Sequence, residues 1–208
     1  MNISFPKNFN SPYKSRSITE FWQRWHITLS SWLRDYLYIS LGGNRRSSLI
    51  TYRNLIITMV LGGLWHGANW TFIVWGSLHG GVLALERFFK NRNMNIIPSF
   101  LHGPATFIVV CIGWIFFRSH SVTDAKLWLS KIFFLNSELS WDLVHIPLKH
   151  KDRFFIVLVI SFFAAFFTKN TWEKTFPPTV KRALLLAFLF VLCLTFMNEE
   201  SPFLYFQF

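Results

Sequence analysis

The 208-residue chain is strongly apolar and basic, with 52% hydrophobic, 19% aromatic and only 15% charged residues. Because soluble domains carry roughly 25% charged residues, this composition excludes an ordinary soluble domain and indicates a membrane protein. The net charge of +11 does not favour nucleic-acid binding. The cations lie in the gaps between apolar runs, where they suit lipid head groups.

Residues 1–17 are polar and have no apolar core segment, so we do not expect a signal peptide there. Membrane insertion is therefore expected from internal segments. A helix is predicted from Ile18 to about Ile39, with Ser17 and Glu20 forming a capping box at its start. Charged residues interrupt its apolar face, which predicts a helix that lies at the membrane interface or is buried against other helices.

The next apolar stretch, Asn54 to Phe89, is too long for one span. A straight helix of this length would measure roughly 54 Å, against a hydrocarbon core of roughly 30 Å. Three glycines weaken helix formation between Gly62 and Asn69, so a break is predicted there. Asn69 can cap a new helix that runs from Trp70 to about Phe89 and is about long enough to span.

Further apolar runs at 106–117, 154–167 and 183–197 are each slightly short for a standard span, and the 122–135 segment is more amphipathic. No internal repeat and no linker between soluble domains is visible, which disfavours a transporter built from inverted repeats. The pattern predicts an all-α fold, a polytopic bundle of transmembrane helices. Cys111 and Cys193 lie inside apolar runs and are interpreted as small core residues.

Histidines divide into two groups by their surroundings. An ionisable side chain at membrane depth is costly and is a functional candidate by default, and three histidines lie in or beside apolar segments: His26, His66 and His79. The remaining four lie in polar or basic connectors and are expected to be solvated: His102, His120, His145 and His150.

His66 lies at the predicted helix break. Irregular backbone at membrane depth is stable only where it is buried in protein or lines a wet cavity, so the break is expected to place an imidazole and free backbone N–H groups beside a cavity. A neutral imidazole can accept a proton from a hydroxyl nucleophile, and N–H groups can stabilise the resulting oxyanion. A histidine that bonds a helix end for packing explains the position equally well, and the residues alone favour neither interpretation.

The other candidates carry weaker signals. His26 could orient a substrate, although a buried structural histidine fits its position somewhat better, and His79, beside two glycines, fits a packing role better still. Trp65, Asn69 and Trp70 are candidates for lining a substrate tunnel, with core packing as the more cautious interpretation of the tryptophans. No ligand spacing indicates a metal site, and no Gly-x-Ser-x-Gly elbow indicates a serine hydrolase.

Two long motifs resemble the membrane-bound O-acyltransferase (MBOAT) family. They are Ser17–Arg45 (SITEFWQRWHITLSSWLRDYLYISLGGNR) and Asn54–Gly80 (NLIITMVLGGLWHGANWTFIVWGSLHG), and the ending Ser201–Phe208 is similar as well. The resemblance is strongest to the bacterial branch that contains alginate O-acetylation proteins, and D-alanyl transfer proteins of teichoic acid synthesis are more distant relatives.

This resemblance implies a ring of membrane helices around a tunnel that reaches the catalytic histidine. In Trp65-His66-Gly67, His66 matches that histidine, and His26 in Arg24-Trp25-His26 matches the second histidine of this branch. The implied donor is acetyl-CoA or another acyl thioester, with no bound cofactor and no metal. The implied acceptor is an exported polysaccharide such as alginate, reached through periplasmic or extracytoplasmic acetyltransferase partners.

The resemblance further implies a multi-pass protein of the bacterial cytoplasmic (inner) membrane, surrounded by lipid. The chain is about half the family's usual length, so residues 1–208 are expected to be the C-terminal portion of a single MBOAT domain without its N-terminal helices. The alternative is a truncated membrane fragment that transfers nothing on its own. Basic residues flank several loops, so the distribution of positive charge does not decide the membrane orientation.

Overall fold

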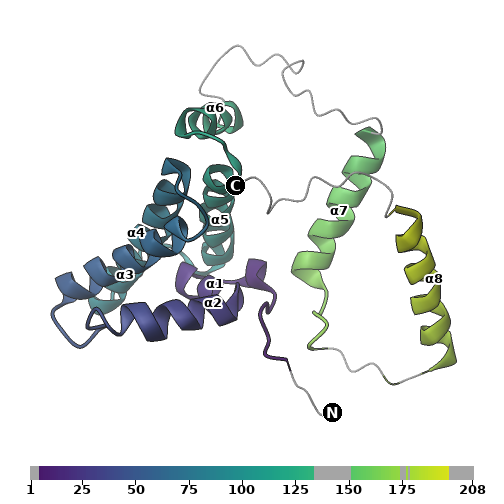
Figure 1. Ribbon diagram of the computed structural model, residues 1–208, viewed down its shortest axis with the longest axis horizontal. Helices are drawn as coiled ribbons and strands as arrows, with labels where there is room; N and C mark the ends of the chain where they lie inside the picture. Colours follow the sequence, from purple (N-terminus) through teal and green to yellow (C-terminus); the bar gives the residue numbers. More distant parts are fainter. Residues whose placement is uncertain (1–4, 134–150, 174–176, 178, 197–208) are drawn as a thin grey trace. The chain divides into compact units, whose positions relative to one another are not determined.

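The computed structural model describes residues 5–133, 151–173, 177 and 179–196, and every regular element within them is helical. This confirms the all-α prediction for the described part of the chain. The chain divides into two compact units, Met1–Thr168 and Lys169–Phe208. The larger unit contains the elements α1 to α7, and the smaller contains α8 (Figure 1).

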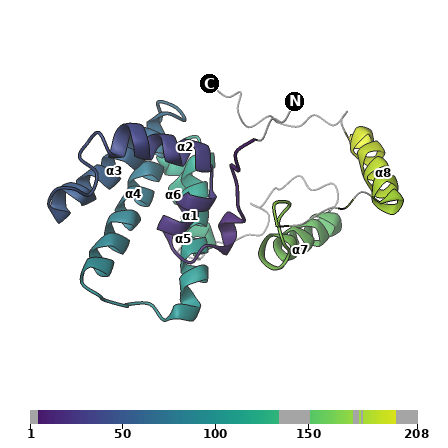
Figure 2. The ribbon, with the colours of Figure 1, turned by 90° about the horizontal axis from the view of Figure 1, so that it is seen from below.

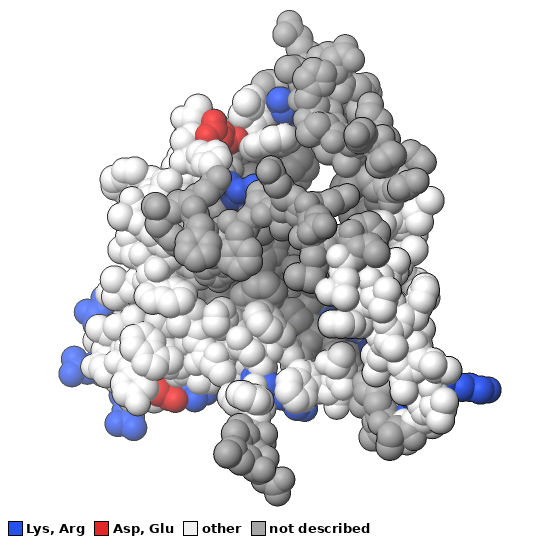
Figure 3. All heavy atoms as spheres, turned by 45° about the vertical axis from the view of Figure 1, so that its right-hand side comes forward, with Lys and Arg blue, Asp and Glu red and all other residues white. Residues whose placement is uncertain are grey.

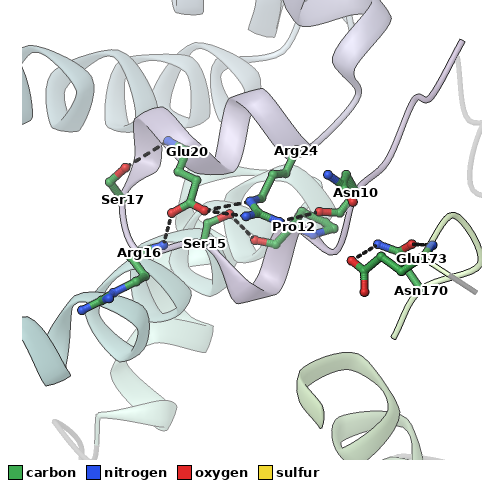
Figure 4. Close-up of polar contacts among 9 residues, drawn as sticks. All are labelled: Asn10, Pro12, Ser15, Arg16, Ser17, Glu20, Arg24, Asn170 and Glu173. Carbon is green, nitrogen blue, oxygen red and sulfur yellow. Dashed lines mark hydrogen bonds and ion pairs between the residues drawn. The ribbon is translucent and has the colours of Figure 1, made fainter. Parts of the chain in front are cut away.

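Helix α1 (Ile18–Arg24) follows the short 3-10 turn η1 (Pro12–Lys14) and begins as predicted. The Ser17 hydroxyl accepts the backbone N–H of Glu20 at 3.0 Å. The Glu20 carboxylate accepts the N–H of Arg16 at 2.8 Å and pairs with the Arg24 guanidinium at 2.8 Å (Figure 4). In the usual capping box the N3 carboxylate accepts the backbone N–H of the N-cap residue, here Ser17. In this variant Glu20 accepts the N–H of the residue before it, Arg16.

The predicted single helix from Ile18 to Ile39 is wrong, because it breaks at His26. Trp25 is extended and His26 is left-handed, and the chain continues as α2 (Ile27–Trp32) and a π-helix, η2 (Leu33–Tyr38). The carbonyl of Asn8 accepts the N–H of Ile27 at 2.8 Å, and the Asn8 side chain accepts the Thr28 hydroxyl at 2.8 Å. These contacts come from the N-terminal segment, so the periodicity of the helix itself could not reveal them.

Helices α3 (Ser48–Leu64) and α4 (Trp70–Asn91) form a tightly packed hairpin, which confirms the predicted break and the Asn69 cap. Glycines allow their backbones to approach. A Cβ on Gly76 would collide with the Met59 carbonyl, and one on Gly80 would lie 2.7 Å from the Ile56 Cα. Such small-residue contacts are a usual means of packing membrane helices, because lipid supplies little hydrophobic drive between them.

The turn η3 (Ser99–Leu101) leads into α5 (His102–Arg118), and the amphipathic segment forms α6 (Val122–Ile132). Helix α5 packs against α4 and reaches α1, and the most deeply buried apolar residues at this junction are Ile18, Phe21 and Val110. Figure 2 shows α1, α4 and α5 side by side in this unit. This junction fixes α1, α4 and α5 relative to one another and so positions the candidate site.

Among the described helices, Ser99–Arg118 is long and apolar enough to cross a bilayer, while Ser48–Leu64 and Phe155–Phe167 are apolar but shorter. Helix α4 is 22 residues long and ends two residues beyond the predicted Phe89. It does not reach the same apolarity, since Glu86, Arg87 and Lys90 lie near its end. One candidate span does not establish a polytopic bundle.

Helices α7 (Lys151–Phe167) and α8 (Val180–Phe196) carry exposed apolar side chains along their described lengths. Cys193 on α8 is exposed as well, so its assignment to a core is wrong. In Figure 3 the described Lys and Arg side chains form small groups, and most other described surface in this view is uncharged. Exposed apolar helix surface of this kind suits contact with lipid.

Candidate functional site

His66 lies in the short segment between α3 and α4, where its ring is half-buried among aromatic side chains. Its centroid is 4.9 Å from that of Phe117 on α5 and 5.6 Å from that of Trp75 on α4. Gly67 follows with φ 153°, a value that disfavours other residues. The break therefore holds the imidazole beside the C-terminal half of α5.

The backbone around His66 differs from the expectation of free N–H groups. The His66 N–H donates to the Gly63 carbonyl at 2.9 Å, and the Gly67 N–H donates to the Leu64 carbonyl at 3.1 Å. These tight turns continue the end of α3 and satisfy carbonyls that the helix would leave without partners. The two N–H groups are thus already engaged and are not free donors for an oxyanion.

His26 lies at the second break, between α1 and α2, with φ 45° and ψ 52°. A non-glycine residue held in this region costs about 1–3 kcal/mol and often marks a functional site. Its ring is half-buried beside Phe9, with centroids 5.9 Å apart, and its Nδ1 is buried without a hydrogen-bond partner among the described residues. The break thus gives His26 a position that a continuous helix would not.

The two imidazoles influence each other electrostatically. Burial lowers the pKa of His66, and the positive charge that His26 can carry lowers this pKa further. Burial also lowers the pKa of His26. Both rings lie outside the helices. Because both pKa values are lowered, both imidazoles are neutral at neutral pH, the form that a general base requires.

An aromatic chain connects the two breaks. From His66, ring contacts run through Phe117 to Trp114 at 5.7 Å and from Trp114 to Trp25 at 4.9 Å. Trp25 immediately precedes His26. The sequence analysis did not identify Phe117 or Trp114, because nothing in the spacing of α5 relates it to a distant helix break.

The sequence analysis did not identify Trp75 either, although its spacing from His79 could have indicated it. It lies four residues before His79 on α4, a spacing that places two side chains on one helix face. The two rings lie 5.0 Å apart, and Trp75 contacts both His79 and His66. Trp75 is 2% exposed, so it forms a packed connection between the two histidines.

His79 is 1% exposed, in agreement with the packing role expected for it. It stacks on Phe21 at 6.2 Å and meets the edge of Trp22 at 5.4 Å. Its Nδ1 has no hydrogen-bond partner among the described residues. A Cβ on Gly113 would lie 2.7 Å from its Nε2, so the imidazole fits only because residue 113 lacks a side chain.

The proposed tunnel residues occupy different environments. Trp65 is 62% exposed and Trp70 is 72% exposed, so neither is packed in the core. The Asn69 side chain accepts the Thr71 N–H at 3.1 Å and donates to the His120 carbonyl at 3.0 Å. Asn69 therefore caps α4 and ties it to the end of α5, and this role accounts for its polar atoms.

Of the four remaining histidines, the structure describes His102 and His120. His102 begins α5, and its Nε2 lies 3.0 Å from the Ile97 carbonyl, so it belongs to a helix and not to a solvated connector. His120 is exposed, while His145 and His150 lie outside the described residues. Within the described part of the chain, no three His, Cys, Asp or Glu residues are grouped so that they could hold a metal ion.

The sequence profile of the membrane-bound O-acyltransferase family matches residues 3–123, which include both helix breaks. The probable alginate O-acetylase AlgI of Azotobacter vinelandii is 58% identical over 60% of this chain and 25% of its own length. The protein of the same name from Pseudomonas putida strain KT2440 is 40% identical over 100% of this chain and 47% of its own length.

A peptidoglycan O-acetyltransferase from Helicobacter pylori is 36% identical over 100% of this chain and 44% of its own length. The chain thus spans about half the length of the curated relatives that it matches throughout. The profile match covers more than half of the 208 residues and contains His26 and His66 in the motifs described above. The chain belongs to the membrane-bound O-acyltransferase family.

Proposed function

We propose that the chain forms the C-terminal part of a polytopic membrane O-acyltransferase. The enzyme transfers an acyl group to hydroxyl groups, and the proposed acyl group is acetyl. The main support is the pair of helix breaks at His66 and His26, inside the part of the chain that matches the family. His66 contacts Phe117 of α5, and Trp25, next to His26, contacts Trp114 of α5. An ionisable side chain at membrane depth is costly, so both histidines are functional candidates by default.

His66 acts as the general base in this proposal. The neutral imidazole takes the proton of an acceptor hydroxyl while the hydroxyl oxygen attacks the thioester carbonyl carbon. The tetrahedral oxyanion then collapses, the carbon–sulfur bond breaks, and the leaving sulfur takes the proton from the imidazolium. The products are an ester and a free thiol, and His66 returns to its neutral form without any external oxidant or reductant.

His26 has a supporting role. A positive charge on His26 lowers the pKa of His66, so a protonated His26 would disfavour protonation of the base. A neutral His26 can bind the acceptor or the donor. Its buried Nδ1, which has no partner within the described residues, is suited to such a contact because an unsatisfied buried polar atom costs about 1–3 kcal/mol.

The names of the relatives guide the choice of substrates. Alginate and peptidoglycan are both polysaccharides that carry hydroxyl groups, so the proposed acceptor is an exported polysaccharide such as alginate. The proposed donor is acetyl-CoA or another acyl thioester. The proposed location is the bacterial inner membrane, with extracytoplasmic acetyltransferases as partners that complete the transfer.

The test uses the complete gene context and measures O-acetyl groups on the exported polysaccharide. His66→Ala is expected to remove acetylation to background while leaving the protein in the membrane, and His120→Ala, a change at an exposed histidine, is expected to leave it unchanged. A stably inserted His66→Ala protein that acetylates at the wild-type level would exclude His66 as the base.

A second candidate function follows from the coverage of the relatives, about half of their length. In this alternative the 208 residues insert into the membrane but transfer no acyl group by themselves. Expression of these residues alone, beside expression from the native gene locus, separates the two cases. Acetylation by the 208 residues alone would exclude this alternative.

A further inference from the structure

A hollow lies away from His66. It has a volume of about 730 Å³ and is lined by α1, η2, α3, the second half of α4, and the segment from Met94 to the first half of α5. Its α4 residues run from Val82 to Lys90, whereas His66 contacts α4 at Trp75. Glu86 and Trp75 are separated by roughly 16 Å along the helix axis, so the hollow is not part of the histidine site.

Apolar side chains form most of the wall of this hollow. Leu55 comes from α3, Leu83 from α4 and Val109 from α5, and Ile96 and Ile97 lie on the connection between α4 and α5. Ile96 is 57% exposed and Ile97 is 43% exposed. A soluble anion would leave this apolar surface in contact with water, which is unfavourable.

The charged residues of the hollow are mainly cations: Arg16, Arg87 and Lys90. Glu86 is the one carboxylate among the described lining residues, and it is already engaged. Its oxygens accept the backbone N–H groups of Ile18 and Thr19 at 2.5 and 2.9 Å and the Thr19 hydroxyl at 2.7 Å. Glu86 therefore caps α1, and no ion pair joins it to Arg87 or Lys90 within the described residues.

Arg87 has a buried guanidinium N–H that an anionic ligand could satisfy. Its Nε is buried and has no hydrogen-bond partner among the described residues. A buried guanidinium N–H is stabilised most by a carboxylate or phosphate oxygen. Within the described part of the chain, no acidic side chain forms an ion pair with Arg87 or Lys90.

We propose that this hollow binds an anionic phospholipid of the surrounding bilayer. The phosphate lies against Arg87 and Lys90, with Arg16 nearby, and an acyl chain lies along the wall formed by Leu55, Leu83 and Val109. Basic pockets between membrane helices bind anionic head groups in this way. A zwitterionic lipid such as phosphatidylcholine offsets its phosphate with its own cation, so the cations Arg16, Arg87 and Lys90 favour a lipid of net negative charge. A soluble phosphate would leave the apolar wall uncovered.

The experiment uses the complete gene product, purified in detergent and reconstituted into phosphatidylcholine nanodiscs that contain phosphatidylglycerol. Lipid that remains bound after delipidation is counted by native mass spectrometry. We expect phosphatidylglycerol to be retained in preference to phosphatidylcholine. Arg87→Gln and Lys90→Gln should each reduce retention about fivefold, the effect of losing one cation near an anionic surface.

Two further variants separate loss of charge from loss of fold. Arg87→Lys keeps the cation and should retain phosphatidylglycerol, and Lys126→Gln removes an exposed cation of α6 that does not line the hollow. Equal retention of the two lipids, or unchanged retention in both glutamine variants, would overturn the proposal. Displacement of the lipid by millimolar inorganic phosphate would indicate a soluble anion site instead. Complete absence of retained phosphatidylglycerol would also overturn the proposal.

Discussion

A single imidazole can serve as a general base only while it is neutral, and the surroundings of His66 favour that form. Burial and the neighbouring His26 hold its pKa below the usual value of 6.5. His66 is therefore neutral at pH 7, and raising the pH further does not increase the fraction of neutral imidazole. Lowering the pH through its pKa protonates it and removes its function.

The first prediction is a pH profile that is flat above neutrality and falls on acidification, with a midpoint below 6.5. His26→Gln removes the repelling charge, although not the burial, so it should move this midpoint to higher pH. Initial rates of acetyl transfer between pH 5 and pH 8 provide the measurement. An acid limb that moves to lower pH in the variant would contradict the electrostatic link between the two histidines.

A second prediction concerns Gly113, whose absent side chain makes room for His79. Gly113→Ala would place a methyl group 2.7 Å from the His79 Nε2 and 3.4 Å from the Trp75 ring. Because Trp75 packs on His66, we expect the turnover rate to fall more than the affinity for the donor. Gly103→Ala on the same helix meets nothing within 4 Å and should have no such effect.

Unequal effects on kcat and KM would distinguish positioning from simple destabilisation. If Gly113→Ala lowers the amount of folded protein but leaves kcat per folded molecule unchanged, His79 and Trp75 have no positioning role. The sequence could identify His26, His66 and His79 as candidates because each lies in or beside an apolar run. It could not identify Gly113 as their neighbour, because that contact joins α4 to α5.

At the scale of helices, the α3–α4 hairpin depends on close backbone contact at glycine. Gly80 and Gly81 are adjacent on α4 but differ in surroundings: a Cβ at position 80 would meet the Ile56 Cα at 2.7 Å, and one at position 81 would meet nothing within 4 Å. The third prediction is that Gly80→Ala destabilises the protein by about 1–3 kcal/mol through overpacking.

Gly81→Ala is the matched control, and it should be neutral or stabilising by up to about 1 kcal/mol because alanine favours helix more than glycine does. Thermal unfolding of the two purified variants in detergent provides the measurement. Equal melting temperatures would show that the close approach of α3 and α4 does not limit stability.

The two helix breaks differ in how far the sequence could predict them. The break before Trp70 was predictable because three glycines and a capping asparagine lie together within an overlong apolar stretch. The break at His26 was not, because Arg24-Trp25-His26 contains no glycine or proline. It depends on Asn8, which supplies acceptors for Ile27 and Thr28 in the first turn of α2, nineteen and twenty residues away.

For the whole molecule, the decisive fact is that this chain spans about half the length of its relatives, although it contains both histidine motifs. The fourth prediction is that co-expression of the 208 residues with the N-terminal half of a relative such as the Pseudomonas putida protein raises acetylation above that of either part alone. Equal amounts of each part in the membrane, measured by immunoblot, are the necessary control. No gain over the separate parts would argue against complementation.

The central claim is that His66 accepts a proton during acyl transfer, and His66→Gln tests it most directly. Glutamine preserves polarity and approximate size but cannot act as a base. The measurement is the initial rate of acetyl transfer from a thioester to a hydroxyl-bearing oligosaccharide in membranes that contain the complete gene product. We predict a loss of about 10²–10⁴-fold with the KM for the donor little changed. Transfer at the wild-type rate by an equally abundant His66→Gln protein would contradict the account.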